Sequence, residues 1–594
     1  MNRKIIDILF ILILISAPFK LANHIFALPG FIGGSFARDF VIWPLLIGLI
    51  YTSYYQWKYK NIFYEWNKFK KYIFVYSTIL LISLIWGTIN FPYWDMFFNG
   101  QAMNNSKFAT AFEFISKLGL NLDEDTVLSF WIMIRFMKNI VLNIFYTFGG
   151  AYMILCWYHD YVDRALELLK NVTVVFLIIV AAYGIVDMCY QNGQMWAQNF
   201  ISYMWPIIHT NTESSYYPMF LGGRNRSLFL EASYFCIYMA FAFPLLWWKL
   251  LESKGIFRLC LALLYLILAC EIFLAQSRTG TAIFLGELSL LVMAVIYKRN
   301  RVFLTFVICL LIGAFISFGS SIYFLQNFQV PAVLGSRAPL ATKKALIIQE
   351  RKISKEIKNT TGGMKKNLIV QEGKTSNDTK KVVGDIKKPL IIQQKQNQRK
   401  NNEISTETYL NDSLLSLIDE EKAGKRAGSN HVRLGITKAN IEIGLQHPLL
   451  GVGSGLDTAY LYEKFKNDQN REIKYRFIKP LEEKGLLSSG SPVMCEYSAQ
   501  FMQTGFLGIF FFVLPMGYIL VCFLRRLYRK IDNEKEFYAI LFITLADIGI
   551  FVTGFGNTVN ITYCYWLMLG ISYVVEFALR ERKQLIIDKV EKCA

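Results

Sequence analysis

Long apolar runs, each close to twenty residues, limit the possible folds of this chain more than any other feature. Hydrophobic residues make up 54% of the 594 residues, and charged residues only 18%. A helix of about twenty apolar residues spans the roughly 30 Å hydrocarbon core of a bilayer, and soluble domains rarely contain such runs. Twelve of these runs occur along the chain. The sequence therefore predicts an all-α polytopic membrane protein with about twelve transmembrane helices.

The first run follows Arg3 and Lys4 and ends near Pro18. A cleaved signal peptide is the alternative, but no small-residue cleavage site follows, so we take this run as the first span. The other expected spans cover residues 39–55, 71–89, 128–157, 171–190, 228–248, 258–275, 280–297, 302–324, 495–523, 536–554 and 558–578.

Basic residues in the short loops predict the orientation. Clusters of Lys and Arg follow each even-numbered span, for example Lys298, Arg299 and Arg301 after the eighth. Short cytoplasmic loops carry an excess of Lys and Arg in membrane proteins. We therefore expect both termini to be cytoplasmic, and the loops after odd-numbered spans to lie outside.

A large polar insertion follows the ninth span and is expected to be extracytoplasmic. We divide the chain into 1–324 with nine spans, 325–428 as a basic loop, 429–494 as an ordered loop segment, and 495–594 with three spans and a cytoplasmic tail. Sixteen Lys and Arg stand against five Asp and Glu over residues 341–400. Long loops are translocated largely regardless of charge, so this excess does not contradict the orientation.

Three copies of a basic and apolar decapeptide lie in the basic loop. KKALIIQERK begins at Lys343, KKNLIVQEGK at Lys365 and KKPLIIQQKQ at Lys387, each copy twenty-two residues after the last. Such repeats could tether an anionic glycan or lipid surface. The flanks are rich in Lys, Asn, Gln and Thr and poor in aromatic residues, which favours a flexible surface chain produced by tandem duplication.

Charge and cysteine usage exclude several classes of function. The net charge of +19 is concentrated in the basic loop and at span ends, so it does not indicate nucleic-acid binding. The ten cysteines are scattered, mostly inside apolar runs, without a CxxC or His/Cys cluster. Neither a disulfide framework nor a zinc site is therefore indicated, and these cysteines behave as small hydrophobic residues.

The passage from Ser429 to Leu456 predicts an ordered element outside the spans. Its first part has the pattern of an amphipathic helix that carries Arg433. The His447-Pro448 pair ends this helix, because the residue before a proline avoids the α region. Alternating glycines follow, and their spacing lets backbone amides approach an anion. We expect Gly451 and Gly453 to contact a phosphate group; a plain hinge is the alternative.

Four arginines lie beside the expected outer ends of spans, where the positive-inside rule does not explain them. They are Arg224 and Arg226 before the sixth span, Arg278 between the seventh and eighth spans, and Arg433. A guanidinium group matches diphosphate oxygens bidentately and stays charged at any working pH. We expect the four to bind a diphosphate; for each one alone, a surface or headgroup-facing arginine is the alternative.

These segments resemble the superfamily of O-antigen ligases and Wzy-type polymerases. The resemblance rests on GGRNRSLFLEASYF at 222–235, SRTG at 277–280, HPLLGVGSG at 447–455 and EYSAQFMQTGFLGIFFF at 496–512, in this order and spacing. It covers mainly residues 220–320 and 430–525, and the twelve-span plan also fits.

Two glycines strengthen the resemblance and one position departs from it. Arg433 and Gly444 match the family's pattern of an arginine and a glycine separated by ten residues, and Gly505 matches the glycine end of its second loop motif. The ligases carry a histidine and a small polar residue before that glycine. Met494 and Cys495 stand there in this chain, which favours the polymerase branch. A ligase that transfers the glycan to an acceptor lipid or protein is the alternative.

The resemblance implies a glycosyltransferase that works without a metal or other cofactor. Its donor would be an oligosaccharide linked to polyprenyl diphosphate, such as undecaprenyl diphosphate, and its acceptor another lipid-linked repeat unit. Polymer would grow at the outer face of the bacterial cytoplasmic membrane, alongside a flippase and a chain-length regulator. Positioned arginines can stabilise a departing diphosphate.

An acceptor hydroxyl also needs a general base. Glu496 begins the tenth span and Glu231 begins the sixth, among the arginines. His447 and His431 flank the helix that carries Arg433. We expect Glu231 mainly to orient Arg226, and Glu496 or a loop histidine to accept the proton; structural ion pairs are the alternative for both glutamates.

Two other classes of function remain open from the sequence. A transporter of the same lipid-linked unit needs polar residues within spans, and Asp187 and Asp547 lie there. Transporters often show repeated span patterns, and none is visible here. A scaffolding subunit of an envelope complex would leave the outer arginines unexplained.

Overall fold

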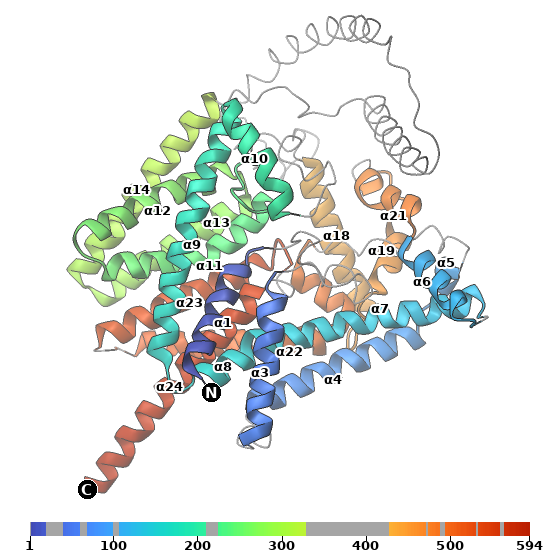
Figure 1. The fold of residues 1–594 in the computed structure, drawn as a ribbon, viewed down its shortest axis with the longest axis horizontal. Coiled ribbons are helices and arrows are strands. Elements are labelled where there is room, and N and C mark those ends of the chain that lie inside the picture. Colours follow the sequence, from blue (N-terminus) through green and yellow to red (C-terminus); the bar gives the residue numbers. More distant parts are fainter. Residues whose placement is uncertain are drawn as a thin grey trace, which may run out of the picture.

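The computed structural model describes residues 2–19, 40–59, 68–98, 106–120, 122–209, 224–327, 427–470, 473–486, 494–529, 531, 533–558 and 563–593. Within these ranges every regular element is a helix, as Figure 1 shows. The three decapeptide repeats lie outside the described residues, so their role stays a prediction.

The helices are α1 (Arg3–Ser16), α3 (Ile42–Tyr59), α4 (Lys68–Ile89), α5 (Trp94–Phe98), α6 (Ser106–Lys117), α7 (Glu124–Thr147), the π-helical turn η4 (Phe148–Tyr152), α8 (Met153–Tyr158), α9 (Val162–Gln191), α10 (Met195–Ile208), α11 (Ala232–Glu252), α12 (Gly255–Leu274), α13 (Arg278–Lys298), α14 (Arg301–Asn327), α18 (Ala427–Gln446), α19 (Asp457–Phe465), the π-helical turn η6 (Lys474–Ile478), α21 (Lys479–Lys484), α22 (Glu496–Tyr528), α23 (Glu534–Thr553) and α24 (Tyr563–Cys593).

Eight of the described helices are long and apolar enough to cross a membrane: α4, α9, α11, α12, α13, α14, α22 and α23. The four other expected spans fall on α1, α3, the broken helix α7–η4–α8, and α24. Helix α1 has only 14 residues, and α24 continues past the expected span to Cys593 through a charged segment. A multi-pass membrane protein is therefore confirmed, while the count of twelve spans stays a prediction.

Helix α11 lies at the core of the molecule, packed against α9, α13 and α23 (Figure 1). It is apolar around its whole circumference and buried along nearly all its length, as expected for a helix without a polar face. Its N-cap residue is Glu231. The loop before α11 is therefore held among the ends of the surrounding helices.

The glycine-rich turn after α18 is joined to a break in α22. Gly505 interrupts that helix with φ 66° and ψ −168°, a conformation that only glycine adopts readily. The freed backbone groups pair with the turn. The amide of Phe506 donates to the carbonyl of Pro448 over 2.7 Å, and the amide of Val452 donates to that of Met502 over 2.9 Å. In Figure 1, helices α19 and α21, which follow this turn, lie with α5 at the right-hand side of the molecule.

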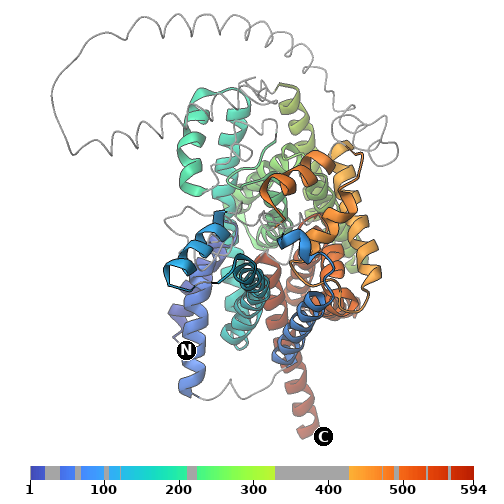
Figure 2. The ribbon, with the colours of Figure 1, turned by 90° about the vertical axis from the view of Figure 1, so that its right-hand side faces the viewer.

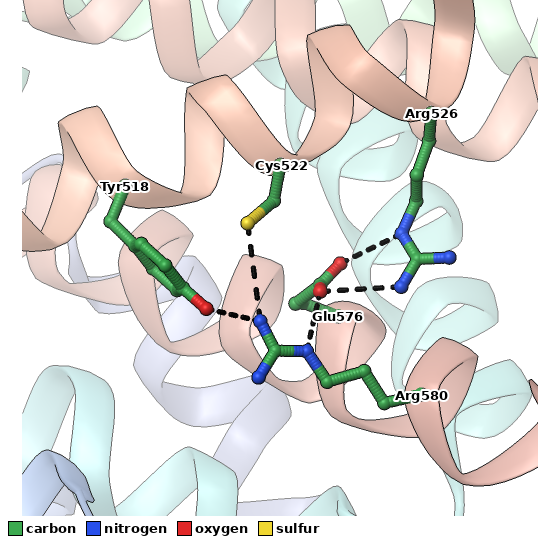
Figure 3. A network of polar contacts seen from close by, with 5 residues as sticks. All are labelled: Tyr518, Cys522, Arg526, Glu576 and Arg580. Atoms are coloured by element: carbon green, nitrogen blue, oxygen red, sulfur yellow. Dashed lines mark hydrogen bonds and ion pairs between the residues drawn. The ribbon is translucent and has the colours of Figure 1, made fainter. Parts of the chain in front are cut away.

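An ion-pair network joins α22 to α24 near their C-terminal parts (Figure 3). Glu576 is 4% exposed, and its two oxygens accept from Nε and Nη2 of Arg526 over 3.0 and 3.2 Å. Arg580 donates from Nε to Glu576 over 2.7 Å and from Nη2 to the hydroxyl of Tyr518. Cys522 lies 4.0 Å from the same Nη2 atom. One carboxylate thus holds two guanidinium groups and ties the two helices together.

Candidate functional site

Glu231 and two of the other arginines, Arg224 and Arg278, gather around Arg433. Arg224 precedes α11 and is exposed, whereas Arg278, Arg433 and Glu231 are half-buried. Burial lowers the pKa of Arg433; the Glu231 carboxylate opposes this shift, and the charges of Arg224 and Arg278 add to it. Arg433 therefore lies within electrostatic reach of the other three groups. Two helices also begin here, α11 after Glu231 and α13 at Arg278.

Helix α18 places Arg433 at this site because of the glycine three turns later. Eleven positions at 3.6 residues per turn bring Arg433 and Gly444 to the same helix face. A Cβ on Gly444 would lie 2.6 Å from the ring of Phe501, so only glycine allows α18 to pack this closely on α22. Between them, Asn440 donates to the hydroxyl of Ser498 over 3.2 Å. The spacing of Arg433 and Gly444 thus lets one face of α18 pack on α22 and present the arginine to the site.

The connection between α23 and α24 completes the site, and the sequence reasoning missed it. Arg433 donates from Nη1 to the carbonyl of Gly556 over 2.7 Å. The amide of Glu496 donates to the carbonyl of Gly554 over 2.8 Å, and Gly556 packs against Thr279. One short turn therefore joins the starts of α13 and α22 to α18. Its signal in the sequence is the GFGNT segment between the last two expected spans.

Arg226 does not join the other arginines, although it was expected to. It is 5% exposed and lies with its guanidinium carbon 5.0 Å from the centre of the Trp205 ring. Its Nη1 donates to the carbonyl of Leu230 over 3.3 Å. Its amide donates to Oδ2 of Asp187 over 2.8 Å. Asp187 is therefore the main acidic neighbour of Arg226, and Glu231 acts on it more weakly.

Asp187 fixes the loop that carries Arg224 and Glu231. It is 3% exposed within α9, and the amide of Ser227 also donates to its Oδ2, over 3.2 Å. Ser227 has a φ of 51°, in the left-handed region that costs a non-glycine residue energy. Its hydroxyl donates to the carbonyl of Val180 over 2.7 Å. These hydrogen bonds to α9 therefore hold the loop before α11 in one conformation.

Glu496, expected as a proton acceptor, is buried in the fold. It is 3% exposed, and its Oε1 accepts from Nε2 of Gln500 over 2.8 Å. Its backbone reaches the site through Gly554, but its side chain lies within electrostatic reach of Tyr76 in α4 and of Tyr565 in α24. The Glu496 carboxylate therefore lies among side chains of α4, α22 and α24.

His447 lies at the far end of α18, fourteen positions after Arg433. At 1.5 Å per residue, this corresponds to about 20 Å along the helix axis. The ring of His447 packs edge-on against Tyr460 at 5.6 Å between centres, and burial lowers its pKa. His447 and the arginines therefore cannot contact one diphosphate together. The side chain of His431 lies outside the described residues.

The glycine turn uses its amides within the fold. Gly451 donates its amide to the carbonyl of His447, and Gly453 donates to that of Gln503, each over 2.9 Å. Gly451 has a φ of 67°, and a Cβ there would lie 2.4 Å from the backbone of Gln503. Both amides that were expected to contact a phosphate therefore donate hydrogen bonds within the fold. The described residues hold no group of three His, Cys, Asp or Glu side chains suited to a metal.

Comparison with known proteins gives one match. No curated protein and no solved structure is similar to this chain. The segment that does match begins within α12 and ends within α21, so it includes Arg278, Arg433 and the glycine turn. Residues 262–480 match the family model described as O-antigen ligase (Wzy_C), which confirms the resemblance drawn from the sequence motifs.

Proposed function

We propose that this protein is a polymerase that joins oligosaccharide repeat units carried on polyprenyl diphosphate. The gathering of Arg224, Arg278 and Glu231 around Arg433 carries the proposal, together with the family match over 262–480. The reaction would take place at the outer face of the bacterial cytoplasmic membrane. The product would be a surface polysaccharide such as O-antigen, capsule or exopolysaccharide.

The three arginines would bind the donor's diphosphate. In the transfer, the bond between the anomeric carbon and the diphosphate oxygen breaks, and the acceptor hydroxyl oxygen bonds to that carbon. Negative charge develops on the leaving oxygen, where fixed guanidinium groups stabilise it without reorganisation. The starts of α11 and α13 add the positive ends of two helix dipoles on the same side.

Glu231 is the best placed group to accept the proton of the acceptor hydroxyl. It is half-buried beside the arginines, and the hydroxyl of Ser233 donates to its Oε2 over 3.0 Å. Its other oxygen, Oε1, is the atom we assign as base. Glu496 is the second candidate, because its backbone contacts the same turn, but its carboxylate is bonded to Gln500. His447 lies too far from the arginines to accept this proton and would contact only a distant part of the glycan.

The test uses purified protein in liposomes with a lipid-linked repeat unit as the only substrate. Polymerase activity lengthens the glycan on its carrier. An Arg433→Ala variant should reduce the rate by about a hundredfold or more, the usual cost of removing one stabilising donor from a transition state. Arg301→Ala is the matched control, because Arg301 is exposed at the start of α14 and expected on the cytoplasmic side. Equal rates for the two variants would exclude the arginine site.

A ligase is the second candidate, because the matched family model is described as O-antigen ligase. A ligase would leave the lipid-linked unit unchanged in this assay and would transfer it only after a separate acceptor lipid or protein is added. Movement of the unit across the bilayer without any transfer would indicate a transporter, which the family match does not support.

A further inference from the structure

Helix α10 is a short helix whose two faces contact different surroundings. It begins four positions after the end of α9, has 14 residues and contains no charged side chain. At 1.5 Å per residue it is about 21 Å long, too short to cross the hydrocarbon core. The rings of Phe200 and Tyr183 lie 5.9 Å apart, so α10 folds back along the outer end of α9 (Figures 1 and 2).

The buried face of α10 holds the arginine loop. Ala197, Ile201 and Trp205 recur every four residues and are all buried. Trp205 lies under the Arg226 guanidinium. A ring nitrogen of the neighbouring His209 lies 3.0 Å from the carbonyl of Leu228. A displacement of α10 would therefore disturb the loop that carries Arg224 and Glu231.

The opposite face of α10 is apolar and exposed. It presents Trp196, Phe200, Tyr203 and Ile207, which are 41% to 72% exposed and follow one another at helical spacing. Large exposed apolar residues continue onto α9, a candidate membrane span, at Val175, Ile178, Ile179 and Ile185. Trp and Tyr are typical of the bilayer interface. The exposed face of α10 therefore continues a lipid-facing surface up to the level of the arginine loop.

We propose that this exposed face is the contact surface for the polyisoprenoid tail of the lipid-linked substrate, an inference that rests on the proposed function. A diphosphate held near Arg224 must leave its tail in the bilayer. Helix α11 offers no path, because it is buried on all sides. Helix α10 connects the arginine loop to lipid through the thickness of a single helix, about 10 Å.

The bilayer sets the size of the expected effect. The tail is already solvated by lipid, so contact with α10 gains packing and orientation instead of hydrophobic transfer, as for helix association in membranes. Replacing Phe200 and Tyr203 with serine should therefore raise KM about tenfold for a donor with a full-length tail. The rate at saturation should change little, because the arginines and Glu231 are untouched.

The test compares two donors with the same glycan and diphosphate, one with a long polyprenyl tail and one with a tail of about two isoprene units. Only the long-tail donor should lose affinity in Phe200→Ser/Tyr203→Ser. The matched control is Leu259→Ser/Leu263→Ser, two exposed apolar residues about one helical turn apart on α12. An equal loss for both donors, or an equal loss in the control, would overturn the inference.

A second measurement does not depend on transfer activity. A photoreactive amino acid placed at Tyr203, or at Leu259 as control, is irradiated in lipid vesicles that contain labelled long-chain polyprenyl diphosphate without glycan. Stronger labelling at Tyr203 supports the tail surface even if no polymer forms, in which case only the proposed function fails. Equal labelling at the two positions would show that α10 contacts ordinary lipid.

Discussion

Neutralising Asp187 tests whether this buried carboxylate anchors the arginine loop. In Asp187→Asn the side chain keeps its shape and one oxygen that can accept the amides of Arg226 and Ser227. What it loses is the negative charge beside the buried guanidinium of Arg226. The substitution therefore isolates the electrostatic contribution of Asp187 to the loop.

The magnitude follows from these contacts. A hydrogen bond to a charged acceptor is worth about 1 kcal/mol more than one to a neutral acceptor, so two amides lose roughly 2 kcal/mol. Asp187 also offsets the charge of the buried Arg226 guanidinium, and removing the partner of a buried charge costs up to about 3–5 kcal/mol. The two effects overlap, and we expect a total of about 3–5 kcal/mol. At 1.4 kcal/mol per tenfold, the loop would open about a hundredfold to a few thousandfold more often.

Hydrogen exchange measured by mass spectrometry on the peptide that contains Arg226 and Ser227 reports this opening. The double variant Asp187→Asn/Arg226→Gln should restore most of the protection, because it removes the uncompensated charge as well. Glu271→Gln is the control. Glu271 is a fully buried carboxyl group of α12, and its oxygens have no hydrogen-bond partner among the described residues, so Glu271→Gln removes no contact of the loop. Unchanged exchange in Asp187→Asn, or a further loss in the double variant, would refute the anchoring.

Three further predictions concern other parts of the fold. Gly444→Val should push α18 away from Phe501 and abolish transfer. Gly435→Ala, at another glycine of α18, should be tolerated, because its Cβ would lie 3.3 Å from the side-chain end of Ile473. The liposome assay checks both variants. Glu576→Ala should lower the stability in detergent by about 1–3 kcal/mol, because two partly exposed arginines lose their shared carboxylate; the exposed Glu581→Ala should leave the thermal midpoint unchanged. Burial lowers the pKa of His447 in the folded protein, so its contribution to folding stability is complete above the unfolded pKa of about 6.5 and is lost as the pH falls from there through the folded pKa. The thermal midpoint should therefore fall less on acidification in His447→Gln than in the wild type.

The sequence predicts elements whose physical cause is local. The expected helix after Ser429 corresponds to α18, which ends at Gln446 directly before the His447-Pro448 pair. The apolar runs predict the spanning helices, because run length alone decides whether a helix can cross a bilayer. The spacing of Arg433 and Gly444 also lies within one helix, so helical periodicity places both on one face.

Partners that are distant in the chain could not be predicted. Arg226 and Glu231 are five positions apart, yet the backbone amide of Arg226 donates a hydrogen bond to Asp187, thirty-nine positions earlier. The amides of the glycine turn were available for an anion until the break in α22 at Gly505 supplied carbonyl acceptors. Helix α10 gave no span signal, because it is only 14 residues long and contains Asn and Gln.

Asp187 offsets the charge of Arg226, which gives the proposed site a matching charge. Three guanidinium groups and the Glu231 carboxylate leave two positive charges in excess, and the donor's two phosphates each carry one ionised oxygen. After transfer, the released terminal phosphate gains nearly one further negative charge at neutral pH, because its second pKa is about 6. If Glu231 is the base, it has by then taken up the hydroxyl proton, so the site carries three positive charges. Charge is therefore balanced on both sides of the reaction, which an added Arg226 or a distant base at His447 would not achieve.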